Sequence, residues 1–479
     1  MDKKLSGLQP EGVFRFFEEI CAIPHGSGNT KMISDYLVEF AKSRNIRYIQ
    51  DELNNVIMFV PGTCGLEDHE PVIIQGHMDM VCDKDESCTI DMDTQGLDVD
   101  HDDKFVFAHG TTLGGDDGIA IAYALAIIDD PSIPHPPLEV VVTVDEETGM
   151  FGAAGIDLSM IQGRKLLNID SEDEGVFTVS CAGGARGTIT LTAEKKTVYG
   201  PVIRLCVDGL QGGHSGVEIH KNRANADKVM GTLLQRINAM MPLCITGLSG
   251  GSKDNAIPRS CKATLVAMGT DLERLNNVIA DLQQEIRSQY DEPEAVITGD
   301  MVDAFGGNAL SCEDSKKVID LLCRVPNGVI AWSKDIDGLV QTSLNLGVMT
   351  LKDAFTMTFA VRSSVNQEKR DLLDELSNIA AEFGADYSEM GDYPAWEYRK
   401  ESPLRDAITQ AYRELNGKDA EVVAIHAGLE CGLLSEKLPG LDCVSLGPQM
   451  HDIHTSREKL DIASTARVWE LILRLLQNL

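Results

Sequence analysis

Three apolar segments with the character of buried strands are each followed directly by acidic residues or histidine. Pro71–Gln75 precedes GHMDM, Leu138–Val144 precedes DEETG, and Lys165–Ile169 ends at Asp170. The β-branched residues of the second segment predict a strand that is buried on both faces. Such strands belong to mostly parallel sheets, in which functional side chains gather beyond the carboxyl ends of the strands.

Helices are predicted between and after these strands. The apolar spacing predicts a strand at Val56–Val60 and helices at Pro10–Cys21, Asn29–Arg44 and Gly115–Ile128. Near the end of the chain it predicts a helix at Glu401–Gly417, a strand at Leu441–Leu446 that precedes GPQMHDIHTS, and a helix at Ala463–Leu476. This last stretch has the same pattern as the first, with helices and an apolar strand that is followed by histidine. We therefore expect 1–196 and 392–479 to form one discontinuous α/β domain with a mostly parallel mixed sheet and flanking helices.

The middle of the chain, 197–391, is predicted to be an inserted α+β domain. Two successive βαβα-like units are expected there, and they suggest two similar halves. The first has strands at Val202–Asp208 and Ala263–Met268 and helices at Asn222–Met241 and Leu272–Arg287. The second has strands at Ala295–Asp300, Leu339–Thr350 and Ala354–Val361 and helices at Ser315–Val325 and Glu368–Phe383.

Composition excludes several classes of protein. The 75 acidic residues outnumber the 42 lysines and arginines, which leaves a net charge of -33. This charge repels phosphate backbones and anionic bilayers, so we expect neither a nucleic-acid partner nor a membrane partner. No apolar run approaches the roughly 20 residues of a spanning helix. The 12 cysteines contain no CxxC pair, and without an export signal they are expected to be reduced thiols in the cytoplasm.

Five local signals at the ends of predicted elements carry chemistry. They are His77 with Asp79, Asp116 in GGDDG, the pair Glu146–Glu147, Asp170, and His454. Each signal alone has an ordinary structural explanation, such as a helix cap or a solvated acidic pair. Two imidazoles and several carboxylates at strand ends are together the ligand set of a two-metal hydrolytic site, with zinc as the expected ion.

The motifs also resemble those of a known family. HMDMV, GTTLGGDDGIA, TVDEETGMFGA, LLNIDSEDEG, GGHSG, DNAIPR, HAGLECG and GPQMHDIHT are similar to those of the aminoacyl-histidine dipeptidases, also called cytosol non-specific or beta-alanyl-histidine dipeptidases. These enzymes belong to the co-catalytic zinc peptidase family that includes carnosinases and bacterial carboxypeptidase G. The likeness spans almost the whole chain. Where the family often has Ala-Asp-Asn-Gly, this chain has Gly115-Asp116-Asp117-Gly118, and it keeps the first aspartate.

The resemblance implies a role for each metal-site residue. His77, Glu147, Asp170 and His454 would be terminal ligands of two Zn²⁺ ions, for which Mn²⁺ or Co²⁺ are possible substitutes, and Asp116 would bridge them. Asp79 would orient the His77 ring through its other nitrogen. One glutamate of the adjacent pair should ligate and the other stay free as a base. Their order in the chain leaves this choice open, and the resemblance assigns Glu146 as the general base.

The inserted domain is expected, by the same resemblance, to be a lid over the substrate. His214 would stabilise the developing oxyanion, and Arg362 would hold the substrate's free carboxylate. Asn255, His426 and Glu430 would also contact the substrate, Glu430 through its α-amine. His214 would act within its own chain, or from a partner subunit if a dimer forms through the lid.

The expected activity is therefore metal-dependent hydrolysis of unblocked dipeptides, including those that end in histidine. A tripeptidase, an aminopeptidase or an N-acyl amino acid amidohydrolase has the same site design, and these alternatives stay open. A non-catalytic metal-dependent peptide binder is the alternative from another class. The expected partner is a small peptide substrate, and both a monomer and a homodimer are compatible with the sequence.

Overall fold

The computed structural model describes residues 3–269 and 271–479, and contacts between residues divide the chain into two compact units. The first unit extends to Ser180 and resumes over Tyr398–Ala424 and Leu429–Leu479. The second comprises Cys181–Glu397 and Ile425–Gly428. It begins earlier than the inserted domain expected at 197–391, because strand β9 (Gly183–Thr192) pairs with strands of the second unit's sheet.

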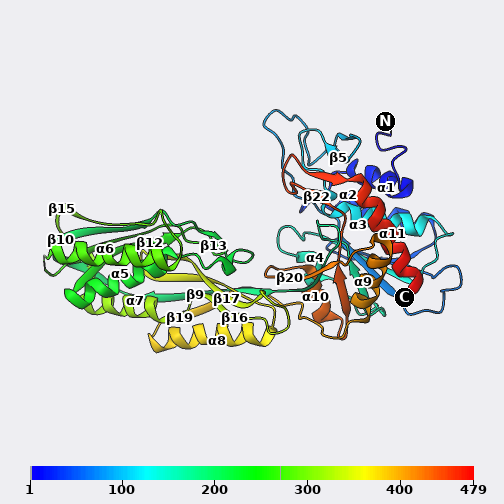
Figure 1. The fold of residues 1–479 in the computed structure, drawn as a ribbon. Coiled ribbons are helices and arrows are strands. Elements are labelled where there is room, and N and C mark those ends of the chain that lie inside the picture. Colours follow the sequence, from blue (N-terminus) through cyan, green and yellow to red (C-terminus); the bar gives the residue numbers. More distant parts are fainter. Residues whose placement is uncertain (1–2, 270) are drawn as a thin grey trace. The chain divides into compact units, whose positions relative to one another are not determined.

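A mixed eight-stranded sheet forms the centre of the first unit, in the order β1-β2-β6-β3-β7-β21-β8-β20. Figure 1 labels its edge strand β20 and the helices of the same unit. Its four central strands, β6, β3, β7 and β21, are parallel to one another, whereas the pairs β1–β2, β2–β6 and β21–β8 are antiparallel. The strands are β1 Arg47–Gln50, β2 Val56–Val60, β3 Val72–His77, β6 Leu138–Thr143, β7 Lys165–Asn168, β8 Val176–Cys181, β20 Glu421–Ile425 and β21 Asp442–Ser445. Because the central strands are parallel, their carboxyl ends meet at one edge of the sheet.

Helices and a small sheet surround this central sheet. The helices are α1 Glu11–Cys21, α2 Lys31–Ser43, α3 Gly115–Asp129, α4 Phe151–Gly155, α9 Pro403–Asn416, α10 Glu430–Lys437 and α11 Ile462–Asn478. The four-stranded sheet has the order β22-β23-β5-β4, with β4 Val99–His101, β5 Phe105–Ala108, β22 Met450–His451 and β23 Lys459–Asp461.

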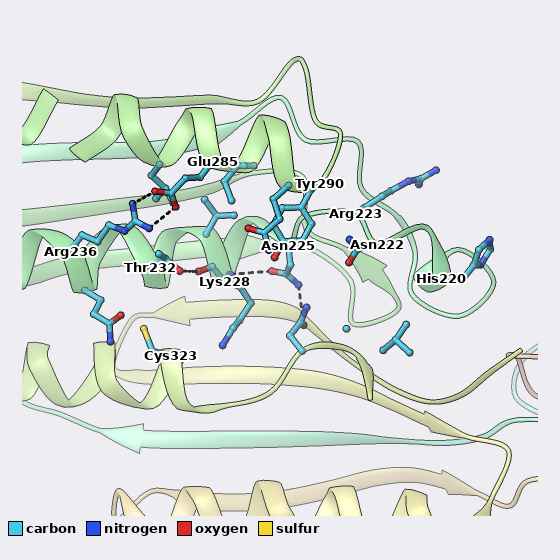
Figure 2. Close-up of a pocket in the computed structure, with 18 of the residues that line it drawn as sticks. His220, Asn222, Arg223, Asn225, Lys228, Thr232, Arg236, Glu285, Tyr290 and Cys323 are labelled. Carbon is cyan, nitrogen blue, oxygen red and sulfur yellow. Dashed lines mark hydrogen bonds and ion pairs between the residues drawn. The ribbon is translucent and has the colours of Figure 1, made fainter. Parts of the chain in front are cut away.

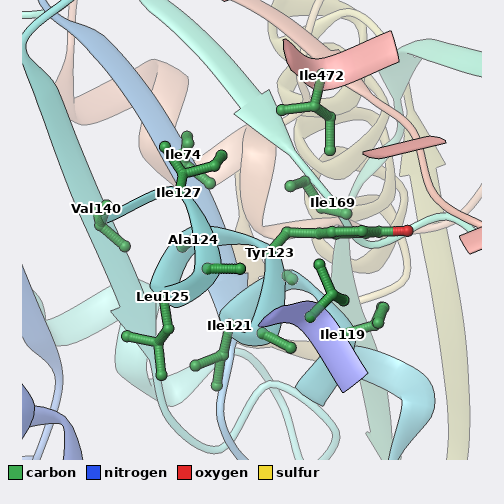
Figure 3. Close-up of a cluster of buried hydrophobic side chains, with 14 of the residues drawn as sticks. Ile74, Ile119, Ile121, Tyr123, Ala124, Leu125, Ile127, Val140, Ile169 and Ile472 are labelled. Carbon is green, nitrogen blue, oxygen red and sulfur yellow. The ribbon is translucent and has the colours of Figure 1, made fainter. Parts of the chain in front are cut away.

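Helix α3 lies in the core of the first unit. The helix is apolar on nearly all sides, as is typical of a buried helix. Figure 3 shows its side chains among residues of β3, β6 and α11. The Tyr123 hydroxyl donates a hydrogen bond of 2.9 Å to the carbonyl of Thr465 in α11. Since α3 is packed on all sides, the acidic residues in its first turn are held in place.

The second unit contains a nine-stranded antiparallel sheet with helices on one face. Its path is β15-β10-β14-β12-β17-β18-β9-β19, and β16 also pairs with β17. The further strands are β10 Lys195–Asp208, β12 Leu243–Gly251, β14 Cys261–Ala267, β15 Val296–Leu310, β16 Gly328–Trp332, β17 Val340–Leu351, β18 Ala354–Ser363 and β19 Asp386–Tyr393, with the short pair β11 Gly213–His214 and β13 Ala256–Ile257. The helices are α5 Ala226–Met240, α6 Leu272–Gln289, α7 Cys312–Arg324 and α8 Asn366–Glu382, with the 3₁₀ turn η1 Ile219–Lys221. Strands from both expected βαβα halves therefore join in a single sheet.

The predicted α/β class, with a mixed sheet and flanking helices, is confirmed. The sheet was expected to be mostly parallel, but only its four central strands are parallel, and the outer pairs β1–β2, β2–β6 and β21–β8 are antiparallel. Most predicted helices and strands fall within a few residues of the observed ones. Over residues 3–269 and 271–479, no helix has the length and apolar character needed to cross a membrane.

Candidate metal centre

The carboxyl ends of the central strands bring the sequence signals of the first unit together. His77 is the last residue of β3, Glu146 and Glu147 follow β6, and Asp170 follows β7. Parallel pairing places His77 opposite Thr143 of β6, so the segments after both strands leave the sheet at the same edge. Asp116 comes from the first turn of α3, and His454 from the loop between β22 and β23.

Asp116 lies between the two imidazoles. Its Oδ1 is 3.0 Å from Nε2 of His77, and its Oδ2 is 3.2 Å from Nε2 of His454. Each imidazole has a second carboxylate nearby: Asp170 Oδ1 lies 3.6 Å from His77 Nε2, and Glu147 Oε1 lies 2.7 Å from His454 Nε2. One carboxylate with an imidazole on each oxygen is the arrangement of a group that bridges two ions.

Ligand atoms of these residues form three overlapping groups. His77, Asp116 and Asp170 form one, Asp116, Glu147 and His454 form another, and His77, Glu146 and Glu147 form the third; the atoms within each group lie within 4.8 Å of one another. The side chains are little exposed, with 1% for His77, 11% for Asp116 and 8% for Glu147, whereas His454 is 42% exposed. The centre therefore has one buried side and one side open to solvent.

The electrostatics of the centre strongly favour positive charge. Hydrogen bonds to Asp116 and Glu147 raise the pKa of His454 to about 10. Burial lowers the pKa of His77, but the hydrogen bonds to Asp116, Asp170 and Asp79 outweigh this effect and raise it well above its usual value. No lysine or arginine in the described part of the chain forms an ion pair with these carboxylates. Nitrogen and oxygen donors that draw in cations fit divalent metal ions, which displace such protons when they bind.

Asp79 orients His77 in a different way from the one expected. The Asp79 main-chain carbonyl oxygen lies 2.9 Å from His77 Nδ1, whereas its carboxylate Oδ1 lies 3.5 Å away. Because a carbonyl only accepts, Nδ1 donates to it, and Nε2 is the ring nitrogen that faces Asp116 and would bind a metal ion once its own proton is displaced. The Asp79 carboxylate accepts from the Ser27 hydroxyl at 2.8 Å and from the Glu146 N–H at 3.1 Å. It thus also fixes the backbone of the adjacent glutamates.

Glu146 is half-buried and lies in an acidic environment. Burial raises the pKa of its carboxyl to about 9; His77 opposes this increase, and Asp170, Glu430 and Glu147 add to it. A pKa raised so far marks a carboxylate that accepts a proton readily when the surrounding charge allows it.

Asp117 was not singled out by the sequence, although it supports the same site. Its Oδ2 accepts a hydrogen bond of 3.1 Å from the His77 N–H, and its side chain is fully buried. The Asp116–Asp117 peptide bond is cis. The second aspartate of GGDDG could have drawn attention to Asp117, because a buried aspartate next to a charged one needs a hydrogen-bond donor.

Glu430 is a buried link between strands. It is 0% exposed, and its Oε2 accepts from Gln75 Nε2 and from the Thr143 hydroxyl, each at 2.6 Å. Gln75 in turn accepts from Asn168 of β7 at 2.7 Å. This polar layer joins β3, β6 and β7 just before the residues that form the candidate centre.

Four of the predicted substrate-contact residues belong to the second unit. His214 ends β11, and its Nδ1 accepts from the N–H groups of Gly216 and Val217 at 3.1 and 3.2 Å. His426 Nε2 lies 2.7 Å from the Ser343 hydroxyl. Burial first and then the charge of Arg362 lower the pKa of both histidines, that of His426 to about 3. Arg362 therefore lies near both rings, and both are neutral.

Arg362 and Asn255 line a cavity of about 270 Å³. Arg362 alternates along β18 with the buried Val361, so it points to the face of the sheet that carries no helices. Its guanidinium donates to the Tyr393 hydroxyl at 3.1 Å.

A larger cavity in the second unit, of about 790 Å³, lies beside α5 and α6 (Figure 2). Its charged lining groups already have partners. Arg236 forms two hydrogen bonds with Glu285, at 3.0 and 2.6 Å. Lys228 donates to the carbonyls of Leu322 and Val325 at 2.6 and 2.7 Å. In contrast, the ion-pair partners of Asp116, Asp170 and Glu147 among the described residues are the imidazoles of His77 and His454. Because no lysine or arginine in the described ranges neutralises these carboxylates, their cluster is the candidate site.

Comparison with known proteins identifies the family. The model of peptidase family M20/M25/M40 matches residues 73–478, and the chain belongs to this family. It is therefore a hydrolase of the metallopeptidase type, which confirms the predicted enzyme class and the resemblance.

The similarity to known proteins extends over almost the whole chain. The cytosol non-specific dipeptidase of Escherichia coli K12 is 34% identical over 481 residues, covering 99% of each chain. The crystal structure of aminoacylhistidine dipeptidase from Vibrio alginolyticus superposes with a TM-score of 0.95 at 33% identity, covering 99% of this chain and 98% of that one. Aminopeptidase PepT from Bacillus cereus shares the fold, with a TM-score of 0.56 at 16% identity and 98% coverage of each chain.

Proposed function

We propose that the chain is a dipeptidase that hydrolyses unblocked dipeptides, including those that end in histidine, with two divalent ions held by the cluster of the first unit. The observation that carries this proposal is the position of Asp116, with one carboxylate oxygen toward each of two imidazoles. The names of the E. coli and Vibrio relatives support a dipeptide as substrate.

Five residues would hold the ions. His77 and Asp170 would bind one, Glu147 and His454 would bind the other, and Asp116 would bind both, in agreement with two of the three groups of ligand atoms. Zn²⁺ suits this mixture of imidazole and carboxylate donors, and Mn²⁺ or Co²⁺ could replace it. When bound, such a pair of dications polarises the scissile carbonyl and makes a water molecule more acidic.

Glu146 is the residue that moves the proton in this proposal. Its carboxylate takes a proton from the attacking water and delivers it to the leaving amine. Asp79 holds the Glu146 backbone through the 3.1 Å hydrogen bond and fixes the tautomer of His77 through its carbonyl.

Residues of the second unit would bind the substrate. Arg362 offers a guanidinium to a carboxylate, and the neutral ring of His214 offers a hydrogen-bond donor to a developing oxyanion. Asn255 and His426 lie in the same part of the second unit as Arg362 and would complete the contacts. The reduced thiols expected from the sequence support a cytoplasmic location, and a monomer or homodimer would serve equally.

Turnover of a small panel of substrates tests this function. We expect the purified chain, loaded with zinc, to cleave Ala-His much faster than Ala-Ala-His or N-acetyl-alanine, with manganese and cobalt as comparisons. Faster cleavage of the tripeptide would favour a tripeptidase or aminopeptidase, and faster cleavage of the acetylated amino acid would favour an amidohydrolase. Binding of Ala-His without turnover by the metal-loaded chain would favour the peptide binder.

A further inference from the structure

Glu458 connects the two segments that carry His454 and Asp116. It lies just before β23, in the loop that contains His454, and it is only 3% exposed. Its Oε2 accepts from the N–H groups of Leu113 and Gly114 at 2.8 and 3.1 Å, and its Oε1 accepts from that of Gly115 at 2.7 Å. These three residues directly precede Asp116.

The segment before Asp116 is shaped to receive this carboxylate. Gly114 has a φ of +69°, and a Cβ there would come within 2.9 Å of Met80 Sδ. A Cβ on Gly115 would lie 3.2 Å from Glu458 Oε1. The two glycines therefore permit both the left-handed turn and the close approach of the carboxylate.

The other end of the connection is equally well defined. His454 has a φ of 59°, and the Glu458 N–H donates to the Thr455 carbonyl at 3.1 Å. β23, which follows at once, pairs with β5 through Lys459 and Phe107. The loop is thus short and is anchored by the pairing of β23 with β5. If Glu458 moved, His454 would move as well.

We propose that Glu458 is a positioning residue of the metal centre, which sets the separation between His454 and Asp116 through three hydrogen bonds to the backbone at 113–115. The inference rests on the proposed function, because it takes His454 and Asp116 as metal ligands. Without the carboxylate, three N–H groups in a buried segment lose their acceptor, and a buried donor without an acceptor is destabilising. Relaxation of that segment would shift Asp116 relative to His454.

The chain offers a matched control in Glu139. This glutamate is 4% exposed, and it likewise accepts from backbone N–H groups, those of Gln162 and Gly163, at 2.8 to 3.1 Å. It lies near the beginning of β6, at the opposite end of the strand from Glu146. Loss of Glu139 should therefore lower stability without changing the metal centre.

The test is zinc affinity of the metal-free full-length chain, measured by competition with a chromophoric chelator, together with thermal unfolding. We expect Glu458→Ala to weaken zinc binding about 10- to 100-fold, the range for residues that support metal ligands. Glu458→Gln keeps one acceptor oxygen and should weaken zinc binding less. Glu139→Ala should lose thermal stability but bind zinc within about twofold of the parent chain. If Glu458→Ala does not fold, Glu458→Gln decides the question against the same control.

Parental zinc affinity in a folded Glu458 variant would overturn the proposal, and so would an equal loss of affinity in Glu139→Ala. Failure of the proposed function itself looks different. In that case the parent chain would bind no zinc, or His454→Ala would leave zinc binding unchanged.

Discussion

Glu146 and Glu147 are neighbours in the sequence, but their carboxylates lie in different surroundings. Glu147 Oε1 is 2.7 Å from the imidazole of His454. Glu146 is the carboxyl whose pKa burial raises to about 9. A carboxylate that binds a metal accepts a proton only at a cost, so the two residues should divide the roles of ligand and base.

We expect Glu146→Ala to lose at least about a hundredfold in kcat, the typical contribution of a general base, while it keeps both metals. Glu147→Ala should instead lose metal. Metal per chain by mass spectrometry and kcat at saturating Ala-His check both variants, each of which serves as the control for the other. If Glu146→Ala is the variant that loses metal, the roles are exchanged.

At the level of single residues, the sequence indicated the ligand types but not their supports. His77, Asp116, Asp170, His454 and the pair Glu146–Glu147 could be predicted to gather at one site because each follows or begins a predicted buried element. The choice of Glu147 as the ligand of the pair came only from the family resemblance. The contact of Asp79 through its carbonyl could not be predicted, since side-chain identity carries no information about which main-chain oxygen accepts. Glu458 and Ser27 gave no signal in the sequence, because their hydrogen-bond partners are distant in sequence and are brought near only by the fold.

At the scale of elements, the first turn of α5 contains a buried acid that has no basic partner in the described part of the chain. Asp227 is fully buried, packs close to Gly250 of β12, and has its pKa raised by burial to about 7, although a hydrogen bond with Cys261 of β14 lowers it. In the unfolded chain, an aspartate has a pKa of about 3.9. Between these two values the folded state holds a proton that the unfolded state releases, so this residue makes stability fall as pH rises from about 4 to 7.

We expect Asp227→Asn to remove this pH dependence. Above pH 7 the variant should be more stable than the parent, by up to about 4 kcal/mol, and the difference should shrink toward pH 4. Chemical unfolding at several pH values measures it, with Asp281→Asn, an exposed residue of α6, as the control. A parent chain whose stability does not decline relative to the variant between pH 4 and 7 would contradict this account.

Strands with a distinctive pattern were predictable, and strands without one were not. Leu138–Thr143 is apolar and β-branched, so it was recognised from the sequence. β9 and β12 contain several glycines and small residues, and their place in the sheet depends on pairing with distant strands. This also explains why the second unit was expected to begin at 197 instead of Cys181.

At the scale of the whole molecule, the sequence predicted the interruption of an α/β unit by an insertion. The late strand β21 was expected to complete the first sheet, and it pairs in parallel with β7. The joining of nine second-unit strands into one antiparallel sheet was harder to predict, because local sequence patterns are alike in one large sheet and in two small ones. The candidate metal centre likewise depends on the whole first unit, since its residues come from five separate segments.

The central claim is that two metal ions at this centre are required for dipeptide hydrolysis. The most direct test is to measure metal per chain and Ala-His turnover on the same sample, before chelation, after exhaustive chelation and after zinc is restored. We expect two metal ions per chain at full activity, loss of turnover as they are removed, and recovery as zinc returns. Full turnover in a sample shown by mass spectrometry to be free of metal would contradict the account.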